Sequence, residues 1–404
     1  MVKPWDTATI GDFFDFKNGL NKGKEFFGYG TPIVNYTDVY RKRGLTKSDV
    51  RGKVNLTRDE IHRFDARKND IFFTRTSETP EEVGMSSVLL DDIDDCVFSG
   101  FVLRGRPKND MFVPEYCKYC FTTEAIRSAI IMGCTYTTRA LTNGTQLSAI
   151  EIVVPPKPEQ EAIAKSLTEI DDLISSLEKL ITKKKAIKQG AMQELLTGKR
   201  RLPGFSEKWE EKPIGFFGNF ISGNCFPIEY QGCPRGELPF YKVSDFNNAG
   251  NSRVMGKANN YISHNIASVL SCKIIPKNSV VFAKIGAAIS LERKRITGFD
   301  CCIDNNMMSF LPYQKNIAAY MCYLFQTIRF GEFVEATALP SLSGKTIGEI
   351  QRTFPPTVEE QIAIATVLSD LDSEIEALER KLTKYRQVKQ GMMQQLLTGK
   401  IRLV

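Results

Sequence analysis

Histidine is scarce in this 404-residue sequence, which contains only His62 and His264. Histidine is the side chain that most often acts as a general acid or base near neutral pH, and neither residue lies in a recognisable catalytic setting. The ten cysteines follow no regular framework, and Cys117-x-x-Cys120 lacks a second pair to complete the four ligands of a zinc site. We therefore expect no metal site and interpret the cysteines as buried free thiols.

Motifs for nucleotide and cofactor binding are also missing. Residues 344–346 read Gly-Lys-Thr, like the end of a phosphate-binding loop, but the first glycine of that motif is absent. Glu292-x-Lys294 resembles a fragment of a nuclease carboxylate–lysine set, although such pairs occur by chance in any charged chain. The sequence contains no glycine-rich cofactor fingerprint and no methyltransferase motif. It therefore predicts a chain that catalyses nothing by itself and needs no cofactor.

Long apolar segments are lacking too. No run of about 18 apolar residues occurs, so no membrane span is expected, and the first residues lack the apolar core of a signal peptide. Hydrophobic residues make up 42% and charged residues 25% of the chain, which is ordinary for a soluble globular protein. We expect a cytoplasmic protein that does not associate with a membrane.

What the sequence does contain is a long internal repeat. Residues 167–202 and 368–403 align without a gap at an offset of 201, and 19 of the 36 positions are identical. Solenoid repeats have units of roughly 20 to 50 residues, so this offset indicates a duplicated module instead. Each module consists of a globular segment followed by a long helix. The sequence thus predicts an α+β fold with an internal pseudo-two-fold repeat.

The globular segments have diverged much further than the helices. Trp5 corresponds to Trp209, and NDIFFTRTS at 69–77 corresponds to NSVVFAKIG at 278–286, but most other positions differ. Drift after an old duplication is one explanation. Drift alone should change the exposed positions of the helices as much as those of the globular segments. We therefore favour a functional constraint that keeps the helices alike while the globular segments change.

Apolar residues in both helical segments alternate at spacings of four and three, the 3.5-residue period of a coiled-coil seam. Acidic residues in the first turn and glycines after the last turn suit the two ends of each helix. We expect the helices to pair as an antiparallel coiled coil, and the alternative is that each packs only on its own globular domain. The predicted seam consists of Ile163, Leu167, Ile170, Ile174, Leu177, Ile181, Ile364, Leu368, Leu371, Ile375, Leu378 and Leu382.

These patterns divide the chain into four segments. We expect α/β domains at 1–156 and 205–356, and helical spacers at 157–204 and 357–404. The net charge is +7, but no segment is broadly basic, so a nucleic-acid surface would have to be local. Residues 41–58 qualify because they carry seven basic side chains and one acidic one. A solvated loop is the alternative interpretation of this window.

The same pair of motifs bounds both helical segments. Each helix is entered through a proline pair and Glu-Gln and is left through Leu-Leu-Thr-Gly-Lys. The motifs are Pro155-Pro156 with Glu159-Gln160, Pro355-Pro356 with Glu360-Gln361, and the LLTGK runs at 195–199 and 396–400. Paired in this way they are quite specific, whereas either motif alone would be weak. The chain resembles, over its whole length, the specificity subunit of type I restriction–modification enzymes.

The resemblance implies a function and a set of partners. Each globular segment would be a target recognition domain that reads one half of a split site in double-stranded DNA. The helices would form a spacer and dock two adenine methyltransferase (modification) subunits, and restriction (motor–nuclease) subunits would complete the complex. This chain would then be a non-catalytic subunit, because the chemistry would reside in its partners.

A DNA-reading chain needs cations for phosphates and hydrogen-bonding side chains for base edges. Arg75 and Lys284 follow matching strand-like runs, so we expect them to share a contact with the DNA backbone. The candidates in the first domain are Arg41, Lys42, Arg43, Lys47, Arg51, Lys53, Arg75 and Thr76. Those in the second domain are Arg253, Lys257, Lys284, Arg293, Lys294 and Arg295.

Two other functional classes remain open at this stage. One is a non-catalytic coiled-coil scaffold that binds only protein partners, which would have no measurable affinity for DNA. The other is a fused nuclease, which would cleave DNA by itself in the presence of a metal ion.

Overall fold

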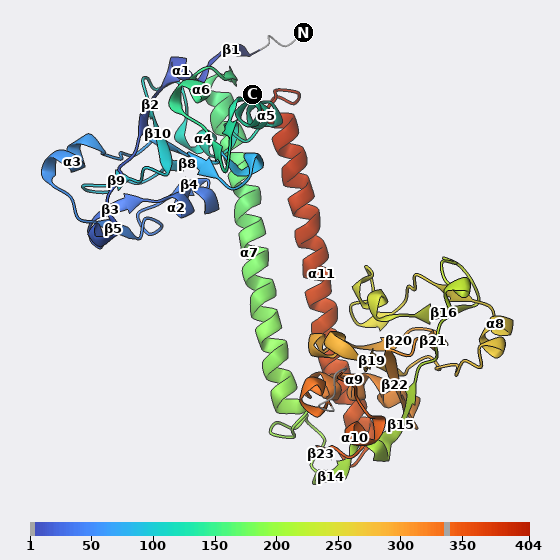
Figure 1. The fold of residues 1–404 in the computed structure, drawn as a ribbon. Coiled ribbons are helices and arrows are strands. Elements are labelled where there is room, and N and C mark those ends of the chain that lie inside the picture. Colours follow the sequence, from blue (N-terminus) through green and yellow to red (C-terminus); the bar gives the residue numbers. More distant parts are fainter. Residues whose placement is uncertain (1–4, 335–339) are drawn as a thin grey trace. The chain divides into compact units, whose positions relative to one another are not determined.

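The computed structural model describes residues 5–334 and 340–404 (Figure 1). The chain divides into two compact units. Unit 1 combines Met1–Glu178 with Lys381–Val404, and unit 2 is Lys179–Arg380. Each unit therefore contains one globular domain, which we call head 1 or head 2, together with part of each of two long helices. The division of the chain into two recognition domains and two spacers, with the boundaries given above, remains a prediction.

The two long helices are α7 (Lys157–Leu195) and α11 (Val358–Leu396), each of 39 residues. The helix α7 begins directly after a proline pair, and α11 begins two residues after one. Both end shortly before a glycine with a positive φ, +70° at Gly198 and +69° at Gly399. Glycine adopts this left-handed conformation without steric cost, which makes it the usual residue that closes a helix.

The central sheet of head 1 has five strands in the order β2-β10-β6-β8-β4. Its pairs are antiparallel except for the parallel pair of β4 and β8. The strands are β2 (Phe14–Asn18), β10 (Val102–Pro107), β6 (Ile71–Thr74), β8 (Ser86–Leu89) and β4 (Gly44–Leu45). The side chains of β6 and β8 are buried throughout, as is usual for the middle of a sheet covered on both faces.

Smaller sheets and short helices complete head 1. The sheets are β5-β3-β9, β1-β13 and β11-β12-β7. Their strands are β1 (Asp6–Thr9), β3 (Phe27–Val34), β5 (Gly52–Val54), β7 (Thr76–Ser77), β9 (Val97–Phe98), β11 (Thr135–Tyr136), β12 (Ala140–Leu141) and β13 (Glu151–Val154). The helices are α1 (Ile10–Phe13), α2 (Tyr36–Arg41), α3 (Arg58–Arg63), α4 (Pro114–Cys120), α5 (Glu124–Gly133) and α6 (Gly144–Ser148).

Head 2 repeats this topology. Its five-stranded sheet has the order β15-β22-β19-β20-β17, again with one parallel pair at the same edge, β17 with β20. These strands are β15 (Gly218–Ser222), β22 (Met307–Pro312), β19 (Val280–Ala283), β20 (Lys294–Thr297) and β17 (Val254–Met255). The heads therefore share one fold although their sequences have diverged, which confirms the predicted α+β fold with an internal repeat.

Further small sheets of head 2 also match those of head 1. They are β18-β16-β21 and β14-β23. The strands are β14 (Glu210–Pro213), β16 (Leu238–Tyr241), β18 (Tyr261–Ile262), β21 (Cys302–Ile303) and β23 (Gln351–Phe354). The helices of head 2 are α8 (His264–Val269), α9 (Ala318–Gln326) and α10 (Gly344–Gly348).

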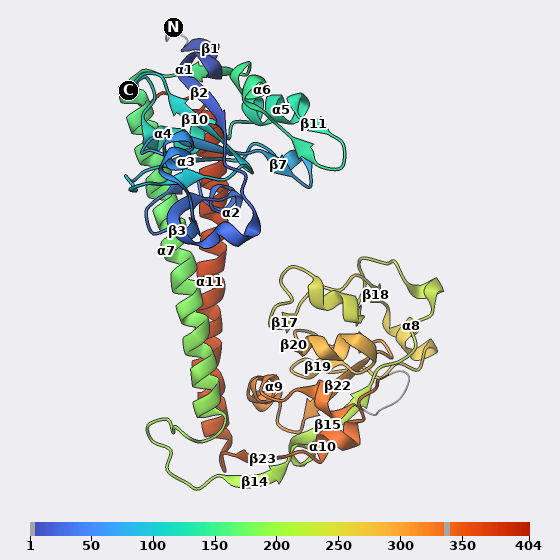
Figure 2. The same ribbon diagram turned by 60° about the vertical axis from the view of Figure 1, so that its left-hand side comes forward.

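Within each unit, α7 and α11 lie side by side and antiparallel (Figures 1 and 2). Ion pairs between them establish the direction, because partners with higher numbers on one helix meet partners with lower numbers on the other. In unit 1 the pairs are Asp171–Lys389 and Glu178–Arg386. In unit 2 they are Lys188–Asp372 and Lys185–Glu379. The predicted antiparallel pairing is confirmed.

The core of each head continues into the helices. In unit 1, Ile163 and Leu167 of α7 share one hydrophobic cluster with the head and with Leu396 of α11. In unit 2, Ile364 and Leu368 of α11 occupy the corresponding cluster. The first residues of the predicted seam thus pack on the head as well as lying beside the other helix. Further along the helices, Leu177, Ile181, Ile375 and Leu382 are buried, whereas Ile170, Ile174, Leu371 and Leu378 are partly buried.

Candidate nucleic-acid interface

The basic window of head 1 runs from the end of α2 through β4 and β5 to the start of α3. Arg41, Lys47, Arg51 and Lys53 are all exposed there. Lys42 is exposed as well, but its ammonium forms an ion pair with Asp49. The window therefore presents four cations that can approach a polyanion, because they extend from short elements at the surface of the head.

The side chain of Arg43, which also belongs to this window, extends toward α11. It is partly buried, and its Nη1 lies 3.6 Å from the sulfur of Met393 on α11. The matching residue of head 2 is Arg253, since both carbonyls accept a hydrogen bond of 3.0 Å from the neighbouring strand. Arg253 binds Ser369 and Ser373 of α11. Both guanidinium groups therefore contact the helices within their own unit. Their contact with DNA stays a prediction.

The Lys294 side chain is buried and therefore not accessible to DNA in this structure. Its side chain is 1% exposed, it forms an ion pair with Glu292, and it donates a hydrogen bond of 3.0 Å to the carbonyl of Ile328. Burial lowers the pKa of Lys294, and Glu292 opposes this effect. The Glu292 carboxylate also accepts hydrogen bonds from the backbone N–H groups of Phe330 and Gly331. The pair that resembles a nuclease fragment thus ties β20 to the segment after α9.

The remaining basic residues of head 2 differ in exposure. Arg295 is partly buried and donates to the carbonyls of Asn251 and Lys294. Arg293 donates a hydrogen bond of 2.7 Å to the side chain of Asn247 and keeps part of its surface exposed. Lys257 is exposed. Head 2 therefore offers fewer accessible cations than head 1 among the residues predicted from the sequence.

Arg75 and Lys284 occupy equivalent places, as their sequence context predicts. Each follows a central strand, β6 or β19, and each backbone N–H donates to the segment that leads into the neighbouring strand. The Arg75 carbonyl accepts from Thr142, and the Lys284 carbonyl accepts from Leu342. Arg75 and Lys284 are both partly exposed. Their shared role in contacting DNA stays a prediction.

A groove of about 690 Å³ lies beside Arg75 in head 1. Lys17 and Lys108 also line it, which gives the groove three cations. Thr76 belongs to β7, which pairs with β12 of the β11–β12 hairpin next to the groove. That hairpin carries Tyr136, which is 57% exposed. Sequence reasoning missed the hairpin, although its run of threonine, tyrosine and arginine contains residue types that contact nucleic acids.

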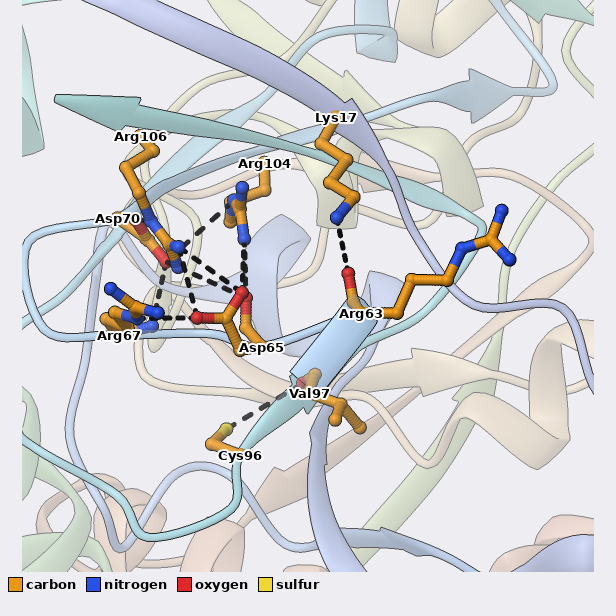
Figure 3. A network of polar contacts seen from close by, with 9 residues as sticks. All are labelled: Lys17, Arg63, Asp65, Arg67, Asp70, Cys96, Val97, Arg104 and Arg106. Carbon is orange, nitrogen blue, oxygen red and sulfur yellow. Dashed lines mark hydrogen bonds and ion pairs between the residues drawn. The ribbon is translucent and has the colours of Figure 1, made fainter. Parts of the chain in front are cut away.

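A network of ion pairs joins β10 of head 1 to the segment that leads into β6 (Figure 3). Arg106 of β10 makes a bidentate contact with Asp70, with distances of 2.8 and 2.7 Å. Arg104 donates to the carbonyl and the carboxylate of Asp65 at 2.7 and 2.9 Å. Burial alone would raise the pKa of Asp65, but the hydrogen bonds and charges of Arg106, Arg104 and Arg67 together lower it.

Replacing Asp70 with asparagine should lower the free energy of unfolding of unit 1 by about 3 kcal/mol, because Arg106 would lose its bidentate carboxylate and keep only Asp65 as a charged partner. Asp70 is 1% exposed, so water cannot replace the lost carboxylate. Hydrogen exchange of peptides from β6 and β10, measured on the full chain, reports this change. Asp94→Asn on the exposed loop of the same head serves as a control and should leave the exchange unchanged.

Asp65 adds a pH dependence to the same network. Its pKa is lowered in the folded state, so its stabilising contribution is present above the unfolded pKa of about 4 and is lost as the pH falls through the folded value. We expect the protection of the β10 amides, taken relative to intrinsic exchange at each pH, to fall below about pH 4, and less so in Asp65→Asn.

Cys117 and Cys120 are buried free thiols on α4. Among residues 5–334 and 340–404 there is no group of three or more histidine, cysteine, aspartate or glutamate side chains placed to hold a metal ion. In the same part of the chain, no helix combines the length and apolar character needed to cross a membrane.

Comparison with known protein families identifies the family to which this chain belongs. The type I restriction modification DNA specificity domain matches the chain twice, over residues 2–189 and 206–385. This chain belongs to that family. Each match covers one head together with the greater part of the helix that follows it.

Relatives that span the whole chain agree with the family assignment. The putative type I restriction enzyme MjaX specificity subunit of Methanocaldococcus jannaschii is 23% identical, over 100% of this chain and 95% of the relative. The MjaVIII specificity subunit of the same organism is 24% identical, over 100% of this chain and 94% of the relative.

Solved structures support the fold. The type I restriction-modification system S subunit from M. genitalium matches with a TM-score of 0.59 at 16% identity, covering 97% of this chain and 96% of that chain. A chain from a study of complex assembly and conformational transition in the type I R-M system matches with a TM-score of 0.58 at 15% identity, covering 98% of both chains.

Reversing the charge of Arg41, Lys47 and Arg51 to glutamate should weaken DNA binding broadly, for cognate and unrelated duplexes alike. Phosphate contacts dominate affinity, and each lost contact reduces the slope of log affinity against log salt by about 0.9. Titration of the assembled complex at several salt concentrations measures both effects. The matched control exchanges arginine and lysine at the same three positions. Unchanged binding by the glutamate variant would show that this window lies away from the DNA.

Proposed function

We propose that this chain is the DNA sequence-specificity subunit of a type I restriction–modification system, in which each head reads one half of a bipartite site. The observation that carries the proposal is that one strand order occurs twice in heads of divergent sequence, while the attached helices remain alike. Different surfaces on one scaffold suit two different half-sites.

The helices are proposed to dock two methyltransferase subunits, with restriction subunits joining the same complex in the cytoplasm. Support comes from surface positions that are identical in both copies although they face water. They are Lys183 and Lys384, Gln189 and Gln390, and Gln193 and Gln394. Side chains that support no core have no reason within this chain to stay alike, but two copies of one partner would give them one. The chain itself would then be non-catalytic.

One face of each helix fits close contact with a partner. Gly190 lies within α7 and Gly391 within α11, and a Cβ added at either would meet nothing within 4 Å. Glycine inside a helix costs about 1 kcal/mol relative to alanine, so open space alone does not explain it. One turn before each glycine, Ile187 and Val388 are 44% and 41% exposed. An apolar residue beside a bare backbone suits a partner helix packed closely against it.

Replacing Gly190 with leucine should weaken methyltransferase binding to unit 2 by about tenfold, because overpacking a close helix contact costs about 1–3 kcal/mol. The same change should raise the stability of the free subunit, since leucine is a better helix former. Calorimetric titration and thermal unfolding measure the two effects separately. Ser175→Ala, at an exposed site on the same helix, is the control that should stabilise without affecting binding. Equal affinity for both variants would place the partner elsewhere.

The proposed function is tested by reconstituting the chain with its methyltransferase and sequencing the methylated adenines that result. Methylation at a split site, dependent on this chain, is the expected outcome. A chain that shows no DNA affinity with or without methyltransferase would instead be a protein scaffold. Cleavage by the purified chain with a divalent metal would point to a nuclease.

A further inference from the structure

A compact polar cluster joins head 2 to both helices within unit 2. We name it node 2, consisting of Lys188, Arg253, Tyr323 and Asp372. The Tyr323 hydroxyl on α9 donates to Asp372 Oδ2 of α11 at 2.7 Å, and Lys188 Nζ of α7 lies 2.7 Å from Asp372 Oδ1. Arg253 Nε approaches Oδ2 at 3.8 Å. One carboxylate therefore collects donors from α7, α9 and the segment before β17.

Further contacts restrict the geometry of node 2. Arg253 donates to the carbonyl of Ser369 at 3.3 Å and to the hydroxyl of Ser373 at 3.1 Å, one turn apart on α11. The Lys188 ammonium lies 5.4 Å from the centre of the Tyr323 ring. The side chains of Lys188 and Asp372 are only 19% and 13% exposed, so solvent screens their attraction less than it screens a surface pair.

Unit 1 contains a counterpart, node 1, consisting of Arg43, Tyr119, Asp171 and Lys389. The Tyr119 hydroxyl on α4 donates to Asp171 Oδ2 of α7 at 2.9 Å, and Lys389 of α11 forms an ion pair with the same carboxylate. The Lys389 ammonium lies 5.9 Å from the Tyr119 ring centre. Arg43 again approaches the helices, although it contacts Met393. Node 1 has fewer contacts than node 2 but the same Tyr–Asp–Lys core.

This core is retained although the surrounding heads have diverged. Apolar side chains of similar volume can often hold two elements together at least as firmly as a buried ion pair. Hydrogen bonds differ in that they need defined distances and angles, so a carboxylate with several donors admits few orientations of the elements around it. Retention of the polar set therefore indicates that orientation matters at this junction, in addition to attachment.

We propose that the two nodes are positioning groups that fix the angle at which each head is held on the helices, and through it the number of base pairs accepted between the half-sites. The inference rests on the proposed function and extends it, because helix length alone would not determine the angle of a head. Node 2, with its additional arginine contacts, is expected to restrict the gap more strongly than node 1.

Tyr323→Phe is the test, because it removes one hydroxyl and leaves the ring that packs in head 2. Tyr320→Phe is the matched control. Tyr320 lies on the same helix and is fully buried, and its hydroxyl has no hydrogen-bond partner among the described residues. Reconstituted complexes of wild type and both variants are given duplexes in which the half-sites are constant and the gap varies one base pair at a time.

The wild type should methylate one gap length, and Tyr320→Phe should do the same. Tyr323→Phe should lose about tenfold in discrimination against gaps one base pair longer or shorter, the factor expected when one hydrogen bond to a charged group is lost. Its preference for the bases of each half-site should not change. Tyr119→Phe in node 1 should show a smaller loss of the same kind.

Lys188→Met provides a second variant that keeps the aliphatic packing while removing the charge, in case Tyr323→Phe does not fold. Discrimination within twofold of wild type in whichever of these variants folds, or altered half-site bases instead of an altered gap, would overturn the inference. A wild type with no preferred gap would mean that the proposed function itself had failed, which keeps the two failures distinguishable.

Discussion

Exchanging residues 205–354 for the matching domain of a related specificity subunit should change one half of the methylated site and leave the other half intact. The exchanged segment contains every strand of head 2, including the pair β14 and β23 that closes it. The hydrophobic core of head 1 consists only of residues that belong to unit 1. Because the two cores share no residue, replacing one should leave the structure of the other unaffected.

The graft must preserve its attachment to α11. We therefore expect the exchange to work best when the donor supplies counterparts of Arg253 and Tyr323, since both contact α11 in unit 2. Sequencing methylated adenines in cells that carry the chimaera measures the outcome. Exchange of residues 1–154 is the reciprocal control, which should change only the opposite half-site. A chimaera in which both half-sites change at once would show that the heads read DNA as a coupled pair.

The helices were the most predictable part of the structure, and the reason is local. A periodic apolar pattern and a closing glycine act within a few residues, and together they indicated one long helix in each predicted spacer segment, where the structure has Lys157–Leu195 and Val358–Leu396. The antiparallel direction followed from the repeat, and the ion pairs within each unit agree with it.

Head topology was much less accessible. The matching runs at 69–77 and 278–286 proved to contain the equivalent strands β6 and β19. Their neighbours could not be inferred, since β6 pairs with β10 and β8, and such non-local pairing depends on contacts that local patterns do not encode. Strands of two residues, such as β4, leave almost no periodic signal.

The candidate interface shows a further limit of reasoning from charge. Arg41 and Arg43 are two positions apart and equally basic, yet one is exposed and the other faces α11. Lys294 lies in a basic run but is buried against Glu292. A charged side chain is normally assigned to the surface. Only the tertiary structure reveals which charges have found a partner inside the protein, and the duplicated Tyr–Asp–Lys core was missed for the same reason.

Lengthening both helices together should lengthen the gap between the half-sites. We would insert four residues after Glu178 in α7 and four after the equivalent Glu379 in α11. Both insertions fall between the pairs Glu178–Arg386 and Lys185–Glu379, so each unit keeps its own ion pair. Four residues add about 6 Å of helix, equivalent to about two base-pair steps of about 3.4 Å. Methylation of the original site should be largely lost, and sites with one or two additional base pairs should replace it.

An insertion in α7 alone is the informative control for this experiment. It would shift one side of the seam by four residues against an unchanged partner, so it should destabilise the helix pair without producing a single new gap. Methylome sequencing separates the results, because half-sites and gap are recorded in the same motif. If the doubly lengthened chain still methylates the original gap, the helices do not set the distance, and the heads must find their half-sites through some other constraint.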